Sequence, residues 1–225
     1  MKKTYLIILA ALAVAAVALF FLFSNPLGQL VKLGVEEFGP RMTQADVRVG
    51  NVRISASDGQ GAISGLFLGN PKGFKTEYAL KAGKIEIGID PASIAQNVVV
   101  IHKVLIDAPQ IIYEKGEHGA NFDAIQRNVE QYLGVDGGKK DDKGAGKKMI
   151  VDSLVIRNAK VSYNGKLDLT LPDIELHNIG KNTGGATPAQ VVKAIIGELV
   201  KQMLLAIPKA AADSVGSAVK GLFGK

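Results

Sequence analysis

The stretch VLIDAPQIIY at residues 104–113 is echoed fifty residues later by LVIRNAKVSY at residues 154–163. Each stretch has an aliphatic run, a short polar break, and a second run that ends on tyrosine. Short aliphatic runs bounded by turn-forming residues are typical of β-strands. We therefore predict a strand, a tight turn and a second strand in each stretch. Repetition of such a hairpin unit predicts a curved antiparallel sheet that grows by adding similar hairpins.

Alternation of apolar and polar residues predicts further strands around this repeat. The clearest case is Ile85, Ile87 and Ile89, which are separated by Lys84, Glu86 and Gly88. The phase of the alternation slips by one residue at Gly50-Asn51, which predicts a bulge or a tight bend. Asp58-Gly59 is a hairpin signal. The remaining predicted strands are residues 62–69, 98–106, 110–114, 149–156, 160–163 and 167–176.

Helical spacing of apolar residues predicts a short helix at Leu27–Phe38, ended by Gly39-Pro40, and another from Asn121 to Gly134. Residues 187–190 read Thr-Pro-Ala-Gln, a capping box with proline at the first helical position. The helix that follows is expected to break at Pro208, after which a weaker amphipathic helix begins. These C-terminal helices either pack on the sheet or act as a lid, a membrane-surface helix or a partner helix. Residues 134–148 are expected to form a mobile loop.

The N-terminal segment predicts a membrane anchor. Lys2 and Lys3 precede an uncharged apolar run from Tyr5 to Phe23, which is just long enough to span a bilayer. A cleaved signal peptide is the alternative, because the alanines at 13–18 resemble a cleavage site. The run continues well past those alanines, which favours an uncleaved anchor. The flanking lysines orient it with its N-terminus in the cytoplasm. We expect an inner-membrane protein with its body in the periplasm: an anchor (1–24), a β domain (25–180) and C-terminal helices (181–225).

Composition argues against several functions. The chain has no cysteine, which excludes disulfides and thiol chemistry. Its net charge of +6 is not gathered in a stripe with aromatic residues, which argues against nucleic-acid binding. The carboxylates Glu114, Glu117 and Asp123 lie near His118 and could form a weak cation site, although a solvated turn explains them better. No cofactor, metal or nucleophile motif is present, so we expect a protein that is not an enzyme.

An α+β protein of this kind, mainly β with helices, must cover the apolar face of its sheet. If helices cover that face fully, it is an ordinary core. If a strip stays open, the strip is an apolar groove suited to acyl chains. The candidate groove residues are the inward aliphatic side chains of three predicted strands: Ile85, Ile87, Ile89, Val104, Ile106, Leu154 and Ile156.

Several segments of the chain resemble the N-terminal part of AsmA-like proteins. Residues 63–74, which read ISGLFLGNPKGF, are one of them, and the sharpest element is their second half, GNPKGF at residues 69–74. Residues 47–61, 87–94, 101–114 and 121–128 are also similar, so that the resemblance spans roughly residues 1–165 with the anchor included.

The resemblance implies an inner-membrane anchor, a periplasmic taco-like sheet with a hydrophobic groove, and a role in envelope lipid homeostasis. Larger relatives are thought to carry phospholipid between the two membranes. Eight to ten strands about 4.8 Å apart give a sheet roughly 40–50 Å wide, too short for such a bridge. A full conduit would therefore need several copies or a partner that extends the groove. The sequence leaves open whether the expected phospholipid ligand is transported or only bound. The alternative is a non-catalytic module that docks another envelope protein.

Overall fold

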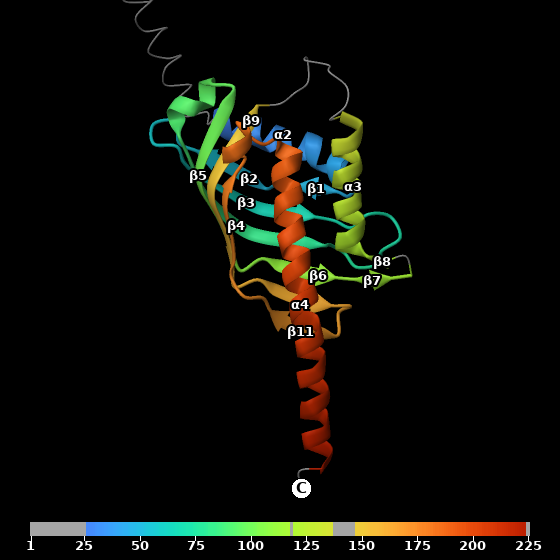
Figure 1. Ribbon diagram of the computed structural model, residues 1–225. Helices are drawn as coiled ribbons and strands as arrows, with labels where there is room; N and C mark the ends of the chain where they lie inside the picture. Colours follow the sequence, from blue (N-terminus) through green and yellow to red (C-terminus); the bar gives the residue numbers. More distant parts are fainter. Residues whose placement is uncertain (1–25, 118, 137–146, 224–225) are drawn as a thin grey trace, which may run out of the picture.

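The computed structural model describes residues 26–117, 119–136 and 147–223 of the 225-residue chain. It confirms an α+β fold: a strongly curled sheet forms a half-barrel, and α-helices cross its concave side (Figure 1). None of the helices within these ranges is both long and apolar enough to cross a membrane. The predicted anchor at residues 5–23 and most of the predicted loop at 134–148 lie outside the described residues.

The main sheet has two arms that meet at β4. Strand β4 pairs with β3 along one edge, and β3 pairs with β1 and β2. The other edge of β4 pairs with β5, which leads to β9 and β12, and with β6, which leads to β10 and β11. A small separate hairpin is formed by β7 and β8. The strands are β1 (Val47–Arg48), β2 (Asn51–Ile54), β3 (Gln60–Leu68), β4 (Leu80–Ile89), β5 (Val98–Asp107), β6 (Gln110–Tyr113), β7 (Lys115–Gly116), β8 (Gly119–Ala120), β9 (Lys148–Arg157), β10 (Lys160–Tyr163), β11 (Leu167–Thr170) and β12 (Ile174–Ile179).

Strands that follow one another in the chain act as single bent strands. Both β5 and β6 run antiparallel to β4. The pairing of Ile85 with Ile106 in β5 and of Leu80 with Ile111 in β6 follows one uninterrupted register, so β5 and β6 form one bent strand. The same continuity joins β1 to β2, β9 to β10 and β11 to β12. It places one residue of each bent strand opposite its neighbours in a row that we call the bend row: Gly50, Gly65, Gly83, Ala108, Asn158 and Pro172.

The sheet folds along the bend row, where two consecutive residues of a strand lie on its outer side. Residues 157–158 and 172–173 are exposed, whereas Ile156, Ala159, Leu171 and Ile174 on either side are buried. The inward phase of the alternation therefore slips by one residue on every strand. The slip predicted at Gly50-Asn51 is confirmed: the Gly50 amide donates to the carbonyls of Ser64 and Gly65, the facing residues of β3.

The sequence repeat marks neighbouring strands, but the predicted hairpins are wrong. Strand β9 pairs with β5 and β10 pairs with β6, so that Val104 faces Leu154 and Tyr113 faces Tyr163. Both pairings are parallel, and the sheet is mixed, not antiparallel. Parallel strands require a crossover of a dozen or more residues, and the chain between β6 and β9, which includes α3, is long enough for it. Within each repeat, one left-handed residue bends the strand without reversing it, and Ala108 and Asn158 occupy that position.

An ionic contact joins the two repeats at the bend. The Arg157 side chain donates to the Asp107 carboxylate over 3.0 and 3.3 Å, and the Asn158 amide donates to it over 2.9 Å. These hydrogen bonds, led by the one from Arg157, lower the pKa of Asp107. Sequence patterns marked these residues only as turn formers, because the contact depends on the parallel pairing.

Replacing Ala108 by glycine is expected to stabilise the protein. Ala108 has φ = +49°, a left-handed conformation that costs a residue with a Cβ about 1–2 kcal/mol. Glycine avoids that cost but loses about 0.5–1 kcal/mol through its greater freedom when unfolded, so a net gain of up to about 1 kcal/mol is expected. Urea unfolding of the full chain in mild detergent, followed by circular dichroism, measures it. Asn158→Gly is the control: asparagine tolerates this conformation, and its amide contact is lost, so no gain should follow. A destabilised Ala108→Gly variant would contradict the argument.

Within the described residues three α-helices lie on the concave side, and each runs past a predicted end, one of them through Gly134 to Asp136. Helix α2 (Pro26–Thr43) continues through Gly39-Pro40. A Cβ on Gly39 would lie 2.8 Å from the Val47 side chain, so glycine allows close contact with β1. Helix α4 (Pro188–Phe223) continues through Pro208, which replaces the two predicted C-terminal helices with one. A proline inside a helix removes one amide donor and clashes with the carbonyl four residues earlier, at a cost of about 3 kcal/mol, yet the helix continues through it. The remaining helices are α3 (Asn121–Asp136), η1 (Pro91–Ala95) and η2 (Lys181–Thr183).

The capping box predicted at the start of α4 is confirmed. The Thr187 amide donates to Gln190 Oε1 over 2.8 Å, and the Gln190 amide donates to Thr187 Oγ1 over 3.3 Å. From this cap α4 crosses in front of the sheet, and its C-terminal part projects beyond β11 (Figure 1). The cap therefore fixes where the helix begins.

Candidate functional site

The seven candidate groove residues lie together on the concave wall. One row joins Ile85 of β4, Ile106 of β5 and Ile156 of β9, and the next row joins Ile87, Val104 and Leu154. Ile89 follows on β4 and faces Ile101. The structure thus brings these residues onto one face of three adjacent strands.

Their burial divides them into two groups. Ile85, Ile89, Leu154 and Ile156 are buried, and these side chains belong to the packed interior. Ile87, Val104 and Ile106 are half-buried, and they are neighbours in the two rows. Only this second group keeps apolar surface that a ligand could contact without displacing core side chains.

Two apolar clusters meet at these half-buried residues. The larger cluster packs α3 and α4 against the sheet, and Val104 and Ile106 lie at its margin. The smaller cluster packs Val31 and Val35 of α2 near Ile89, and Ile87 lies at its margin. Ile101 packs against both clusters. The helices thus cover both sides of the concave wall, and the half-buried strip runs between them.

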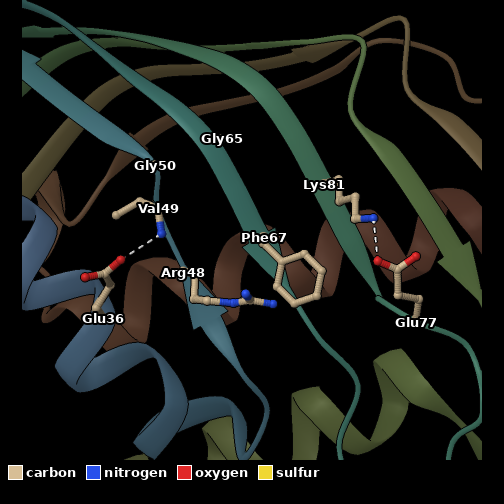
Figure 2. Close-up of a pocket in the computed structure, with 8 residues that line it drawn as sticks. All are labelled: Glu36, Arg48, Val49, Gly50, Gly65, Phe67, Glu77 and Lys81. Carbon is tan, nitrogen blue, oxygen red and sulfur yellow. Dashed lines mark hydrogen bonds and ion pairs between the residues drawn. The ribbon is translucent and has the colours of Figure 1, made fainter.

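A separate hollow of about 490 Å³ lies on the outer face of the sheet (Figure 2). The Arg48 guanidinium lies 4.4 Å from the centre of the Phe67 ring and 2.8 Å from the Asp46 carboxylate. Lys81 is paired with Glu77 at 3.1 Å. Since both cations already have carboxylate partners, the hollow presents no unpaired charge from them to select a ligand. It also lies away from the candidate groove residues.

The segment that carries the sharpest resemblance, residues 69–74, is fixed by a polar network in which Asn121 is buried and Asn70, Thr76 and Glu114 are half-buried. The Asn70 amide donates to the Thr76 carbonyl over 2.8 Å, and its Oδ1 accepts from Asn121 Nδ2 over 2.8 Å. The Glu114 carboxylate accepts from the amides of Lys75 and Thr76 and from Thr76 Oγ1, the last over 2.6 Å. Within the described residues no buried side-chain nitrogen or oxygen lacks a partner. The network is a structural clamp, and no sequence signal links groups so far apart in the chain.

Glu114→Gln is expected to make the stability less dependent on acid pH. Burial raises the pKa of Glu114, but the hydrogen bonds from Thr76 and Lys75 outweigh it and leave the pKa below its usual value of 4.5. A carboxylate with a lowered pKa stabilises the fold above its unfolded pKa, and the contribution is lost as pH falls through the folded pKa. Wild type should therefore exceed the variant at neutral pH, and the difference should shrink below about pH 4.5.

Urea unfolding of the full chain between about pH 7 and pH 3 provides the measurement. Glu117→Gln removes a neighbouring exposed carboxylate and controls for the loss of one negative charge. A difference between Glu114→Gln and wild type that stayed constant over this range would contradict the assignment.

Glu114 and Asp123, two members of the weak cation site considered from the sequence, each bind protein groups and do not face a shared ion. Glu114 faces Lys75 and Thr76, and Asp123 accepts from the Ala120 amide over 3.2 Å. His118 lies outside the described residues, and no group of three His, Asp or Glu side chains is arranged for a metal in the ranges that are described. His102 and His177 are exposed and lie beside Asp152 and Glu175 on the strands.

Comparison of the chain with protein-family models and with curated proteins finds no match. The resemblance to AsmA-like proteins therefore stays a prediction from the quoted segments.

Proposed function

We propose that this chain is an inner-membrane-anchored protein of a bacterial envelope that binds phospholipid on the concave wall of its periplasmic sheet. The N-terminal apolar run and the resemblance of residues 63–74 to AsmA-like proteins motivate the location and the ligand. The observation that supports the site best is the half-buried strip of Ile87, Val104 and Ile106 between the two apolar clusters. Each methylene of an acyl chain that is buried against this strip would stabilise the complex by about 0.8 kcal/mol.

The surroundings of the strip limit the size of the ligand that can bind. The buried neighbours Ile85, Leu154 and Ile156 give it a rigid floor. Helix α4 lies over the β11 and β12 side, and α2 lies over the β1 and β2 side. A single acyl chain fits this arrangement better than a whole bilayer patch, because both flanks are already occupied by helices. Binding without conduction is therefore the proposed activity.

Site-specific photocrosslinking tests this proposal. A photoreactive amino acid placed at Val104 in the full chain, in phospholipid membranes, should capture phospholipid, detected by mass spectrometry. Lys103 is the matched control, because it is the adjacent residue on the outer face of the same strand. Ile87→Asp should abolish capture at Val104. Equal capture at positions 103 and 104, or no capture at either, would reject the proposed site.

A docking module is the second candidate, and one observation favours it. Leu204 and Leu205 of α4 are 53% and 58% exposed, and the C-terminal part of this helix projects beyond β11 (Figure 1). Exposed neighbouring leucines on a projecting helix are typical of a contact with another protein. Under this candidate a photoreactive residue at position 205 captures a protein, and position 104 captures no lipid.

A further inference from the structure

One end of the half-barrel carries aliphatic side chains on its surface. Leu30 and Leu33 are 66% and 61% exposed in the first turns of α2. Their neighbours Leu27 and Val31 turn the other way and pack against the sheet. The first turns of α2 are thus apolar on two sides, although only one side has a partner among the residues that the structure describes.

Other half-buried aliphatic residues meet α2 at the same end. Ile94 of η1 and Val99 of β5 pack on the cluster that also holds Leu27 and Val31. Val98 and Val100 flank Val99 and are also only half-buried. We call the first turns of α2, η1 and the start of β5 the apolar pole.

Positive charge borders the apolar pole. The Lys147 ammonium donates to the Ile94 carbonyl, and the Lys148 amide donates to the Asn97 carbonyl over 3.2 Å. Both lysine residues are exposed. The acidic residues at this end, Asp58 and Asp90, each accept a hydrogen bond from a backbone amide, those of Gln60 and Ala92. Exposed aliphatic side chains bordered by lysines are suited to an anionic bilayer surface.

The chain outside the described residues indicates what covers the pole. The apolar run ends at Phe23, and only Ser24 and Asn25 separate it from α2. If that run spans the bilayer, Leu30 and Leu33 are tethered at the headgroup region, where apolar side chains and lysines both find partners.

We infer that the apolar pole docks on the surface of the bilayer that holds the N-terminal segment, with Leu30 and Leu33 inserted among the lipid headgroups and Lys147 and Lys148 facing anionic phosphates. This inference rests on the membrane anchor of the proposed function. Docking of the apolar pole also gives lipid a route to the concave wall. Ile101 packs against both the smaller apolar cluster, which reaches the pole, and the larger cluster, which has Val104 at its margin.

Environment-sensitive labels test the docking, and the absence of native cysteine makes single-site labelling clean. The full chain is reconstituted into vesicles of phosphatidylethanolamine and phosphatidylglycerol. A nitrobenzoxadiazole label on Leu30→Cys or Leu33→Cys should shift its emission to the blue and be quenched by nitroxide-labelled lipid. Leu204→Cys and Leu205→Cys are matched controls, similarly exposed leucines on α4, and their labels should report water.

A label on Val14→Cys separates failure of the docking from failure of the anchor. A label at position 14 within the bilayer, with labels at 30 and 33 in water, would overturn the docking and leave the proposed function standing. A label at position 14 in water would overturn the docking and the anchor together. Replacing Lys147 and Lys148 by glutamate should reduce the blue shift at position 30, and an unchanged shift would overturn the phosphate contact.

Discussion

Asn121→Ala should destabilise the protein by roughly 3–5 kcal/mol, because it removes four hydrogen bonds from a site with no access to water. Asn121 is 0% exposed. Its Nδ2 donates to Asn70 Oδ1 and to the Ile112 carbonyl, both over 2.8 Å. Its Oδ1 accepts from the amides of Glu114 and Phe122 over 3.1 and 2.9 Å. Alanine has no polar atom with which to replace any of these contacts.

Urea unfolding of the full chain in mild detergent, followed by far-ultraviolet circular dichroism, measures the loss. Asn97→Ala is the control, since Asn97 is an exposed asparagine and its replacement should change the free energy of unfolding by less than about 0.5 kcal/mol. Asn121→Asp keeps one acceptor oxygen and loses the amide donor, so it should also be strongly destabilised. A loss below about 1 kcal/mol for Asn121→Ala would show that the network is not a clamp.

Leu199→Ala should cost about 2–5 kcal/mol, because it opens a cavity where α4 packs on the concave wall. Leu199 is 2% exposed and belongs to the larger apolar cluster. Leu204, on the same helix, is 53% exposed, and Leu204→Ala should change stability by no more than about 0.5 kcal/mol. The pair compares one residue type at a buried and an exposed position of a single helix.

The same variants connect stability to the proposed function. Val104 and Ile106 lie at the margin of the cluster that contains Leu199. If α4 limits access to the strip, loosening it with Leu199→Ala should increase phospholipid capture at position 104, whereas Leu204→Ala should leave capture unchanged. Thermal unfolding and photocrosslinking on one preparation supply both readouts. Equal stability of the two variants would contradict the packing of α4.

Local patterns predicted most strands and the start of one helix. The alternation at Ile85–Ile89 predicts a strand because successive side chains of a strand point to opposite faces. The phase slip at Gly50-Asn51 reads out a bend for the same reason, and the structure extends that bend to every strand of the main sheet. The capping box at Thr187 is equally local, since both of its hydrogen bonds join residues three positions apart.

The candidate site was predicted only in part. Inward aliphatic residues on three strands were placed on one face, as their alternation requires. The division between buried Ile85 and half-buried Ile87 depends on where α2, α3 and α4 lie, which no alternation encodes. The clamp formed by Asn70, Glu114 and Asn121 joins residues up to 51 positions apart and left no pattern to find.

Local sequence patterns were sufficient to predict most strands, the bend at Gly50, the capped start of α4 and the correspondence between residues 104–113 and 154–163. These features follow from the period of side chains along the backbone and from contacts within a few residues. The parallel pairing of the two repeats and their continuation through the bends follow from long-range contacts, because a break of three residues is compatible with either a turn or a bend. The tertiary structure also decided which aliphatic side chains stay accessible, because α2 and α4 reach the concave wall from opposite ends of the described chain.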